Sequence, residues 1–98
     1  MNIDNFYSEI ENSLLLFKEG LIDLQPFTHI ALNINNFIIN KKVTYKDLSN
    51  EGKLCQHLVN VAILGGNLGI LYGVKELYSL VLGCLLHDIG KMYIDNSI

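Results

Sequence analysis

Charged residues are scarce in this sequence of 98 residues, at 17% of the chain, where soluble domains average about a quarter. Much of the surface must therefore be neutral polar or covered by a partner. The net charge of −3 argues against a general nucleic-acid-binding face, which needs clustered Lys and Arg side chains. The sequence also lacks the cluster of Lys and Arg that is typical of proteins that bind an anionic membrane surface.

Cysteines and long apolar runs are scarce as well. Cys55 and Cys84 lie far apart and form no CxxC pair, which favours two small buried hydrophobic residues in a reducing compartment. The longest apolar run, residues 80–86, is much shorter than the roughly 20 residues that span a bilayer. The N-terminal segment is acidic where a secretory signal would be basic. The sequence therefore predicts a soluble, cytoplasmic chain without a membrane segment.

Apolar residues, in contrast, make up 50% of the chain, enough for the core of one small domain. Their spacing predicts four helices and no strand, so the expected fold class is an all-α bundle. Pro26 separates the first two helices, and Gly20 and Gly73 are the expected stops after the first and the third. Thr44 with Asp47 predicts a capping box for one short turn. The helices are expected at about 4–18, from after Pro26 to near Lys41 and Lys42, at about 51–72 and at about 74–90.

Each predicted helix has an apolar stripe at helical spacing, which predicts its buried face. The adjacent Gly65 and Gly66 weaken the third helix by about 1 kcal/mol each, and we expect them to permit close approach of a neighbouring helix. The stripes consist of Ile10, Leu14 and Phe17; Ile30, Ile34, Phe37 and Ile38; Leu54, Leu58, Val61, Gly65, Leu68 and Tyr72; and Leu77, Val81, Cys84 and Leu85.

Three ionisable residues, His57, His87 and Asp88, fall where the third and fourth helices should be apolar. A buried imidazole or carboxylate is costly unless it is paired or coordinated. Imidazole nitrogen and carboxylate oxygen are usual ligands of iron, manganese and zinc. We therefore expect the three side chains to converge on one divalent ion, with Asp88 able to bridge to a second. Lys91 lies one turn later and suits a phosphate oxygen, which together with a metal suits phosphoryl chemistry.

Structural roles stay open for the same residues. A histidine on an apolar helix, such as His57, is often a hydrogen-bonded core residue, and Asp88 can pair with Lys91 at i,i+3. His29 has no partner at a useful spacing, so we expect a structural or surface role for it.

The run LLHDIGKMYI, residues 85–94, resembles the HDIGK signature of HD-superfamily metal-dependent phosphohydrolases. Upstream, HLVNVAIL at 57–64 is similar to the HSxxVA helix that supplies the first histidine in the HD-GYP branch. The resemblance covers about 44–98, and it implies that this part is the N-terminal part of an HD or HD-GYP domain. Residues 1–43 are left as an N-terminal helical region of unknown role. The expected fold is thus an HD-domain-like helical bundle, incomplete at about four helices.

The resemblance also implies an activity and its ligands. Members hold two or three metals, usually iron or manganese, and the HD-GYP branch hydrolyses cyclic di-GMP. By position, His57, His87 and Asp88 would bind the first metal, and Asp88 would bridge to the second beside the attacking hydroxide. Lys91 would contact a substrate phosphate, so Asp88 and Lys91 are the expected catalytic residues and Lys91 the substrate-binding one. Lys53 stands where members with a third metal place a glutamate, so we expect no third metal.

The later histidines, the final aspartate and the GYP loop of that family have no counterpart in these residues. We therefore expect a metal-dependent phosphohydrolase or phosphodiesterase segment with little or no activity alone. Its expected partners are a cyclic dinucleotide or other phosphoester and the rest of the HD domain, and a homo-oligomer stays open. For the same reason we expect a large exposed apolar surface. The alternatives are a non-enzymatic helical regulatory or interaction module, and another HD enzyme such as a nucleotide phosphohydrolase or an RNA-cleaving protein.

Overall fold

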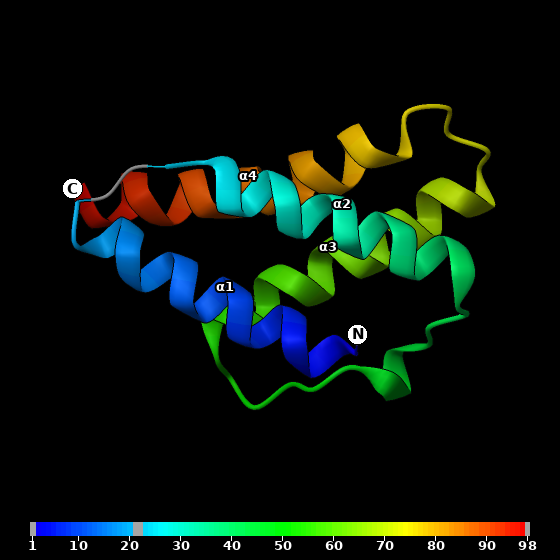
Figure 1. The fold of residues 1–98 in the computed structure, drawn as a ribbon, viewed down its shortest axis with the longest axis horizontal. Helices are drawn as coiled ribbons and strands as arrows, with labels where there is room; N and C mark the ends of the chain where they lie inside the picture. The colour runs from blue at the N-terminus through cyan, green and yellow to red at the C-terminus, as the bar shows by residue number, and fades with distance from the viewer. Residues whose placement is uncertain (1, 21–22, 98) are drawn as a thin grey trace.

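Four α-helices make up the computed structural model, which describes residues 2–20 and 23–97, with the side chains of Tyr45, Asp88 and residues 91–97 outside that description. No strand occurs in the described ranges, so the predicted all-α class is confirmed. In Figure 1, α2 lies beside α4 and α1 lies beside α3, and both α2 and α3 contact all three other helices. The elements are α1 (Ile3–Lys18), α2 (Gln25–Asn40), the 3-10 turn η1 (Tyr45–Asp47), α3 (Leu54–Leu71) and α4 (Leu77–Ser97).

The helix ends follow the turn chemistry of the sequence. The side chain of Asn2 accepts a backbone hydrogen bond and caps the start of α1. Gly20 (φ +90°) follows α1 and Gly73 (φ +70°) follows α3, both in the left-handed region that glycine adopts at little cost. Beyond Gly73, the N–H of Val74 donates to the carbonyl oxygen of Gly69 at 2.9 Å, as in a Schellman turn. Both predicted stops are therefore confirmed.

One half of the predicted capping box, the bond from the N–H of Thr44 to the side chain of Asp47, is present in the connection between α2 and α3. Oδ2 of Asp47 accepts from the N–H of Thr44 at 2.9 Å and from its Oγ1 at 3.3 Å. In return, the N–H of Asp47 donates to the carbonyl oxygen of Thr44 at 3.0 Å. One 3-10 turn forms there, as the sequence predicts, and the rest of 41–53 is irregular.

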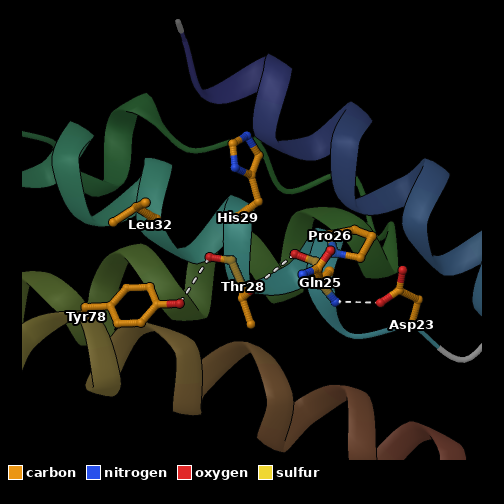
Figure 2. Close-up of a pocket in the computed structure, with 7 residues that line it drawn as sticks. All are labelled: Asp23, Gln25, Pro26, Thr28, His29, Leu32 and Tyr78. Atoms are coloured by element: carbon orange, nitrogen blue, oxygen red, sulfur yellow. Dashed lines mark hydrogen bonds between the residues drawn. The ribbon is translucent and has the colours of Figure 1, made fainter.

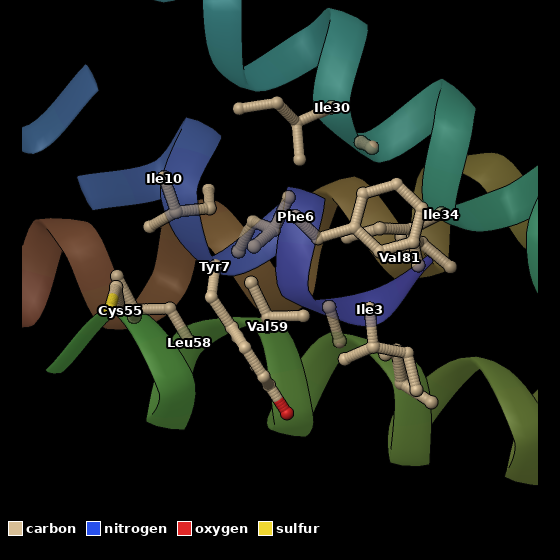
Figure 3. Close-up of a cluster of buried hydrophobic side chains, with 14 of the residues drawn as sticks. Ile3, Phe6, Tyr7, Ile10, Ile30, Ile34, Cys55, Leu58, Val59 and Val81 are labelled. Carbon is tan, nitrogen blue, oxygen red and sulfur yellow. The ribbon is translucent and has the colours of Figure 1, made fainter. Parts of the chain in front are cut away.

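The core lies between the four helices and confirms the predicted faces of α1, α2 and α4. Ile10, Ile34 and Val81 are fully buried, and their stripe neighbours are buried or half-buried. Figure 3 shows side chains from all four helices meeting in this cluster. The largest fully buried side chains are Phe6, Phe27, Ile10, Ile34, Leu58, Ile63, Leu85, Val59 and Val81.

The buried face of α3 differs from the predicted one. Of the predicted stripe Leu58 is fully buried, whereas Leu54, Leu68 and Tyr72 are exposed. Because α3 carries apolar residues on its exposed side as well as on its buried side, apolar periodicity does not select the side that turns inward. Small residues select it, since they let the neighbouring helices approach. The buried residues are Cys55, Gln56, Leu58, Val59, Ala62, Ile63, Gly66 and Gly69.

Close approach at Gly65 and Gly66 is confirmed. A Cβ atom added at Gly65 would lie 2.8 Å from Sγ of Cys84 on α4. A Cβ added at Gly66 would collide with Ile38 of α2 and lie 3.1 Å from Cγ2 of Val81 on α4. The backbone of α3 therefore lies against side chains of α2 and α4. A larger residue in place of Gly66 would prevent this close approach.

Helix α4 begins at Leu77 and continues to Ser97, beyond the predicted end at Gly90. An internal glycine costs a helix about 1 kcal/mol against alanine. Burial of Ile89, which is 3% exposed, offsets that cost by packing the same part of the helix against the core. The backbone at position 91 is therefore helical, one turn after His87.

Candidate functional site

His57 lies in the first turn of α3. Its N–H donates to the carbonyl oxygen of Lys53, the residue before the helix, at 3.1 Å. The side chain of His57 is exposed, whereas the adjacent Leu58 is fully buried. The expectation that His57 faces inward is therefore wrong, because α3 buries the side that carries Val59 and Ala62. Because the imidazole of His57 is exposed, no metal is needed to offset a cost of burying it. That argument for a metal at His57 is therefore removed.

His87 lies in α4 and is exposed as well. Leu85 and Ile89, two residues to either side, are 0% and 3% exposed, and residues two apart on a helix point to widely different sides. The expectation of an inward His87 is therefore also wrong. The side chains of Asp88 and Lys91 lie outside the described residues, so their expected roles stay predictions.

The packing of α3 against α4 sets the distance between the two histidines. The helices run antiparallel, joined by the turn at 72–76 (Figure 1), with Gly65 against Cys84 and Gly66 against Val81. Counted from these contacts, His57 is level with about position 91 of α4. His57 and His87 are then separated by about 6 Å along the helix axes, at about 1.5 Å per residue. The first histidine and the HDIGK-like run thus lie at the same end of the helix pair.

Two exposed imidazoles at one end of a helix pair need further ligands to hold a metal ion. Within the described part of the chain, no group of three or more His, Cys, Asp or Glu side chains is placed to hold one. The carboxylate of Asp88 lies outside that part. The ligand set His57, His87 and Asp88 therefore stays a prediction.

A polar network that the sequence does not reveal lies one turn beyond His57. Tyr7 Oη donates to Oδ1 of Asn60 at 2.7 Å and accepts from the N–H of Ser49 at 2.9 Å. Nδ2 of Asn60 donates to the carbonyl oxygen of Ser49 at 2.8 Å, which closes the triangle. It ties α1, α3 and the connection before α3 together. Burial raises the pKa of Tyr7 above its ordinary value of 10.0, because the phenolate would lose its hydration.

Replacing Tyr7 by phenylalanine is expected to lower the free energy of unfolding by about 1–3 kcal/mol, because Asn60 and Ser49 lose a partner. The raised pKa adds a pH signature. Since the unfolded state releases this proton first, the stability from Tyr7 is fully present below pH 10.0 and is lost as the pH rises through the folded-state pKa. Urea unfolding at pH 7 to 11 measures both effects, with exposed Tyr72→Phe as the control. Equal curves for both variants would contradict the network.

A shallow hollow lies where the start of α2 meets α4 (Figure 2). Three hydrogen bonds join some of its polar groups, one of them from the N–H of Gln25 to Oδ1 of Asp23 at 3.0 Å. Tyr78 Oη donates to the carbonyl oxygen of Thr28 at 3.3 Å, and Thr28 Oγ1 donates to the carbonyl oxygen of Gln25 at 2.8 Å. His29 at its rim is exposed, which agrees with the expected surface position. The lining residues are Asp23, Gln25, Pro26, Thr28, His29, Leu32 and Tyr78.

Helix α3 is long and apolar enough to cross a membrane by length and composition, which the short run at 80–86 did not indicate. Within the bundle, 44% of these residues are buried, and the core helix of a soluble protein passes the same test. The helix is weak evidence on a membrane location.

No family model, curated protein or solved structure matches this chain. The HD resemblance rests on the residues of 57–64 and 85–94 themselves.

Proposed function

We propose that the chain supplies His57, His87 and Asp88 to a divalent metal site that acts on a phosphoester, cyclic di-GMP being the proposed substrate. The observation that supports this proposal is the antiparallel register of α3 and α4, which brings His57 level with the HDIGK-like run. Both imidazoles are exposed, so an ion can reach them without any opening of the core.

Each residue has one role in this proposal. His57, His87 and Asp88 bind an iron or manganese ion, and Lys91 contacts a phosphate oxygen of the substrate. A bound divalent ion supplies positive charge that stabilises the phosphoryl oxygens. Three ligands leave coordination positions open, so the proposal requires further ligands from the remaining helices of an HD domain.

Binding of Mn²⁺ tests the proposal directly. His57→Ala and His87→Ala are each expected to weaken Mn²⁺ binding by at least about tenfold, the usual result of removing part of a metal site. The matched control is His29→Ala, which removes an exposed histidine of α2 and should leave binding unchanged. Calorimetric titration measures affinity, and the electron paramagnetic resonance spectrum of Mn²⁺ reports nitrogen ligands. Equal affinity in all three variants, or no binding by the native chain, would contradict the proposal.

Turnover gives a second readout. We expect no measurable hydrolysis of cyclic di-GMP by residues 1–98 alone with Mn²⁺ or Fe²⁺, since the stabilisation of attacking and leaving oxygens needs a complete two-metal site. Product formation followed by chromatography checks this expectation. Robust turnover that is lost in His57→Ala would show instead that the chain already holds a complete site.

A second candidate function is a helical interaction module without enzymatic activity. The observation that favours it is the exposure of Leu64, Leu68 and Leu71 on α3, at 43%, 57% and 75%. Exposed apolar patches of this kind mark interaction sites. Association of the chain, with Mn²⁺ binding that is indifferent to all three histidine variants, would favour this candidate over the first.

A further inference from the structure

The first turn of α3 has no side-chain cap of its own. Lys53 stands at the N-cap position, and its side chain makes no capping hydrogen bond. The first hydrogen bond of the helix runs from the N–H of His57 to the carbonyl oxygen of Lys53 at 3.1 Å. Residues 50–54 are all exposed, so apolar burial does not hold the residue that accepts this bond. Helix ends without such support fray. The backbone at His57 therefore depends on other contacts of the chain that leads into α3.

Buried polar side chains from α1 and α3 supply these contacts. Gln56 is 7% exposed, and its Oε1 accepts from the N–H of Glu51 at 2.8 Å. Two residues earlier, the N–H of Ser49 donates to Oη of Tyr7, and its carbonyl oxygen accepts from Nδ2 of Asn60. Figure 3 shows Tyr7 extending from α1 towards α3. We call these five residues the α3 clamp: Tyr7, Ser49, Glu51, Gln56 and Asn60.

The α3 clamp holds the chain on both sides of His57. Gln56 immediately precedes the histidine, and Asn60 follows it by about one turn. Since Gln56 and Asn60 are four residues apart, they lie on one side of α3. His57 points about 100° away from Gln56, and its side chain is exposed. The clamp thus holds the backbone beneath the imidazole without covering it.

Packing alone gives no reason for glutamine at position 56. A buried amide costs stability unless it is hydrogen-bonded, and leucine would fill nearly the same space. The bond that Gln56 makes does not add apolar burial. It fixes the backbone at Glu51, and through it the approach of the chain to Lys53 at the start of the helix.

We infer that the α3 clamp positions His57 for the divalent ion, with Gln56 and Tyr7 as positioning residues. This inference rests on the proposed function, in which His57 is a metal ligand. An ion binds more tightly to a side chain that is already held in place, because less conformational freedom is lost on binding. The region 1–43, to which the sequence assigns no role, thus contributes to the site through Tyr7.

Amide hydrogen exchange followed by nuclear magnetic resonance measures the positioning without a metal. In Gln56→Leu, the protection of the His57 amide should fall by at least about threefold relative to that of Ile63, a buried residue of the same helix. Leucine keeps the core filled, so global stability should change little. Gln56→Glu keeps an acceptor oxygen at this position and should retain the native protection. A His57 amide that is unprotected in the native chain, or equally protected in Gln56→Leu, would overturn the inference.

Mn²⁺ affinity tests whether the positioning matters for binding. Gln56→Leu and Tyr7→Phe are each expected to weaken Mn²⁺ binding by about tenfold, the lower end of what support behind a metal ligand contributes, although every proposed ligand remains. The control is Ile38→Val, which shortens a buried side chain of α2 outside the clamp and should leave the affinity unchanged. If the clamp only stabilises the fold, all three folded variants bind Mn²⁺ like the native chain.

The two proposals fail in different ways. Lack of Mn²⁺ binding by the native chain would contradict the proposed function and the positioning with it. Native binding that is weakened in His57→Ala but unchanged in Gln56→Leu and Tyr7→Phe would leave the metal site standing and overturn the positioning alone. Circular dichroism at the titration concentrations checks that each variant is folded.

Discussion

Replacing Phe6 by alanine is expected to remove about 3–5 kcal/mol from the free energy of unfolding. Phe6 is fully buried on α1, and its ring meets that of Phe37 on α2 edge to face, with centroids 5.5 Å apart. Figure 3 shows Phe6 in a cluster with Ile34, Val59 and Val81, one each from α2, α3 and α4. Truncation at this point removes the ring contact with Phe37 and leaves a cavity in the core cluster. A chain of this size has about 5–15 kcal/mol of stability in total, so the loss is a large part of it.

Urea unfolding followed by circular dichroism measures this loss at one fixed protein concentration. The control is Leu16→Ala on the same helix, since Leu16 is 47% exposed and its truncation should change stability by about 0.5 kcal/mol or less. Similar small losses in the two variants would show that α1 does not pack into the core through Phe6.

The helices themselves could be predicted because local signals agree with one another. Gly20 and Gly73 stop helices through positive φ angles, and the Thr44 and Asp47 side-chain chemistry fixes the turn between α2 and α3. These effects act within a few residues, so the sequence displays them directly. The end of α4 could not be predicted in this way, because Gly90 is a weak stop that the burial of Ile89 overrides.

The buried face of α3 could not be predicted from periodicity, since both sides of this helix are apolar. The choice depends on Gly66 and Gly69, which let α2 and α4 approach, and this is a tertiary effect. The expectation that His57 faces the core was wrong for the same reason. Once the buried face is known, the exposed position of Leu64 and Leu68 on the other side of α3 follows from the spacing alone.

The ligand set of the candidate site stays a prediction, and the exposure of both histidines differs from the expected inward position. The similarity of 57–64 and 85–94 to HD-type motifs places His57 and His87 at the same end of two packed helices, and the structure has that register. The Tyr7 network had no such signal, because Tyr7 and Asn60 are far apart in sequence and no spacing rule joins them. A tyrosine on an apolar stripe is the available hint, since a buried hydroxyl needs a partner.

Replacing Gly66 by valine is expected to lower the free energy of unfolding by about 1–3 kcal/mol through overpacking. The first added carbon already collides with Ile38 and lies 3.1 Å from Cγ2 of Val81. Valine adds two further methyl groups to a Cβ that is already crowded. Its restricted χ1 leaves few rotamers in which those methyl groups could avoid their neighbours. Because Ile38 of α2 and Val81 of α4 both lie at Gly66, the larger side chain must turn the buried end of Ile38 aside or push a helix outward, and we expect this cost to exceed the gain in helix propensity over glycine.

Gly83→Ala is the matched control, because Gly83 also lies inside a helix but a Cβ there would meet nothing within 4 Å. Without a steric cost, alanine should stabilise α4 by up to about 1 kcal/mol. The two substitutions thus have opposite expected signs for the same kind of change, the removal of a helical glycine. Urea midpoints of the native chain and the two variants decide between packing and propensity. A Gly66→Val chain that is more stable than the native one would mean that α3 does not contact α2 and α4 at Gly66, and the register that brings His57 level with the HDIGK-like run would lose its basis.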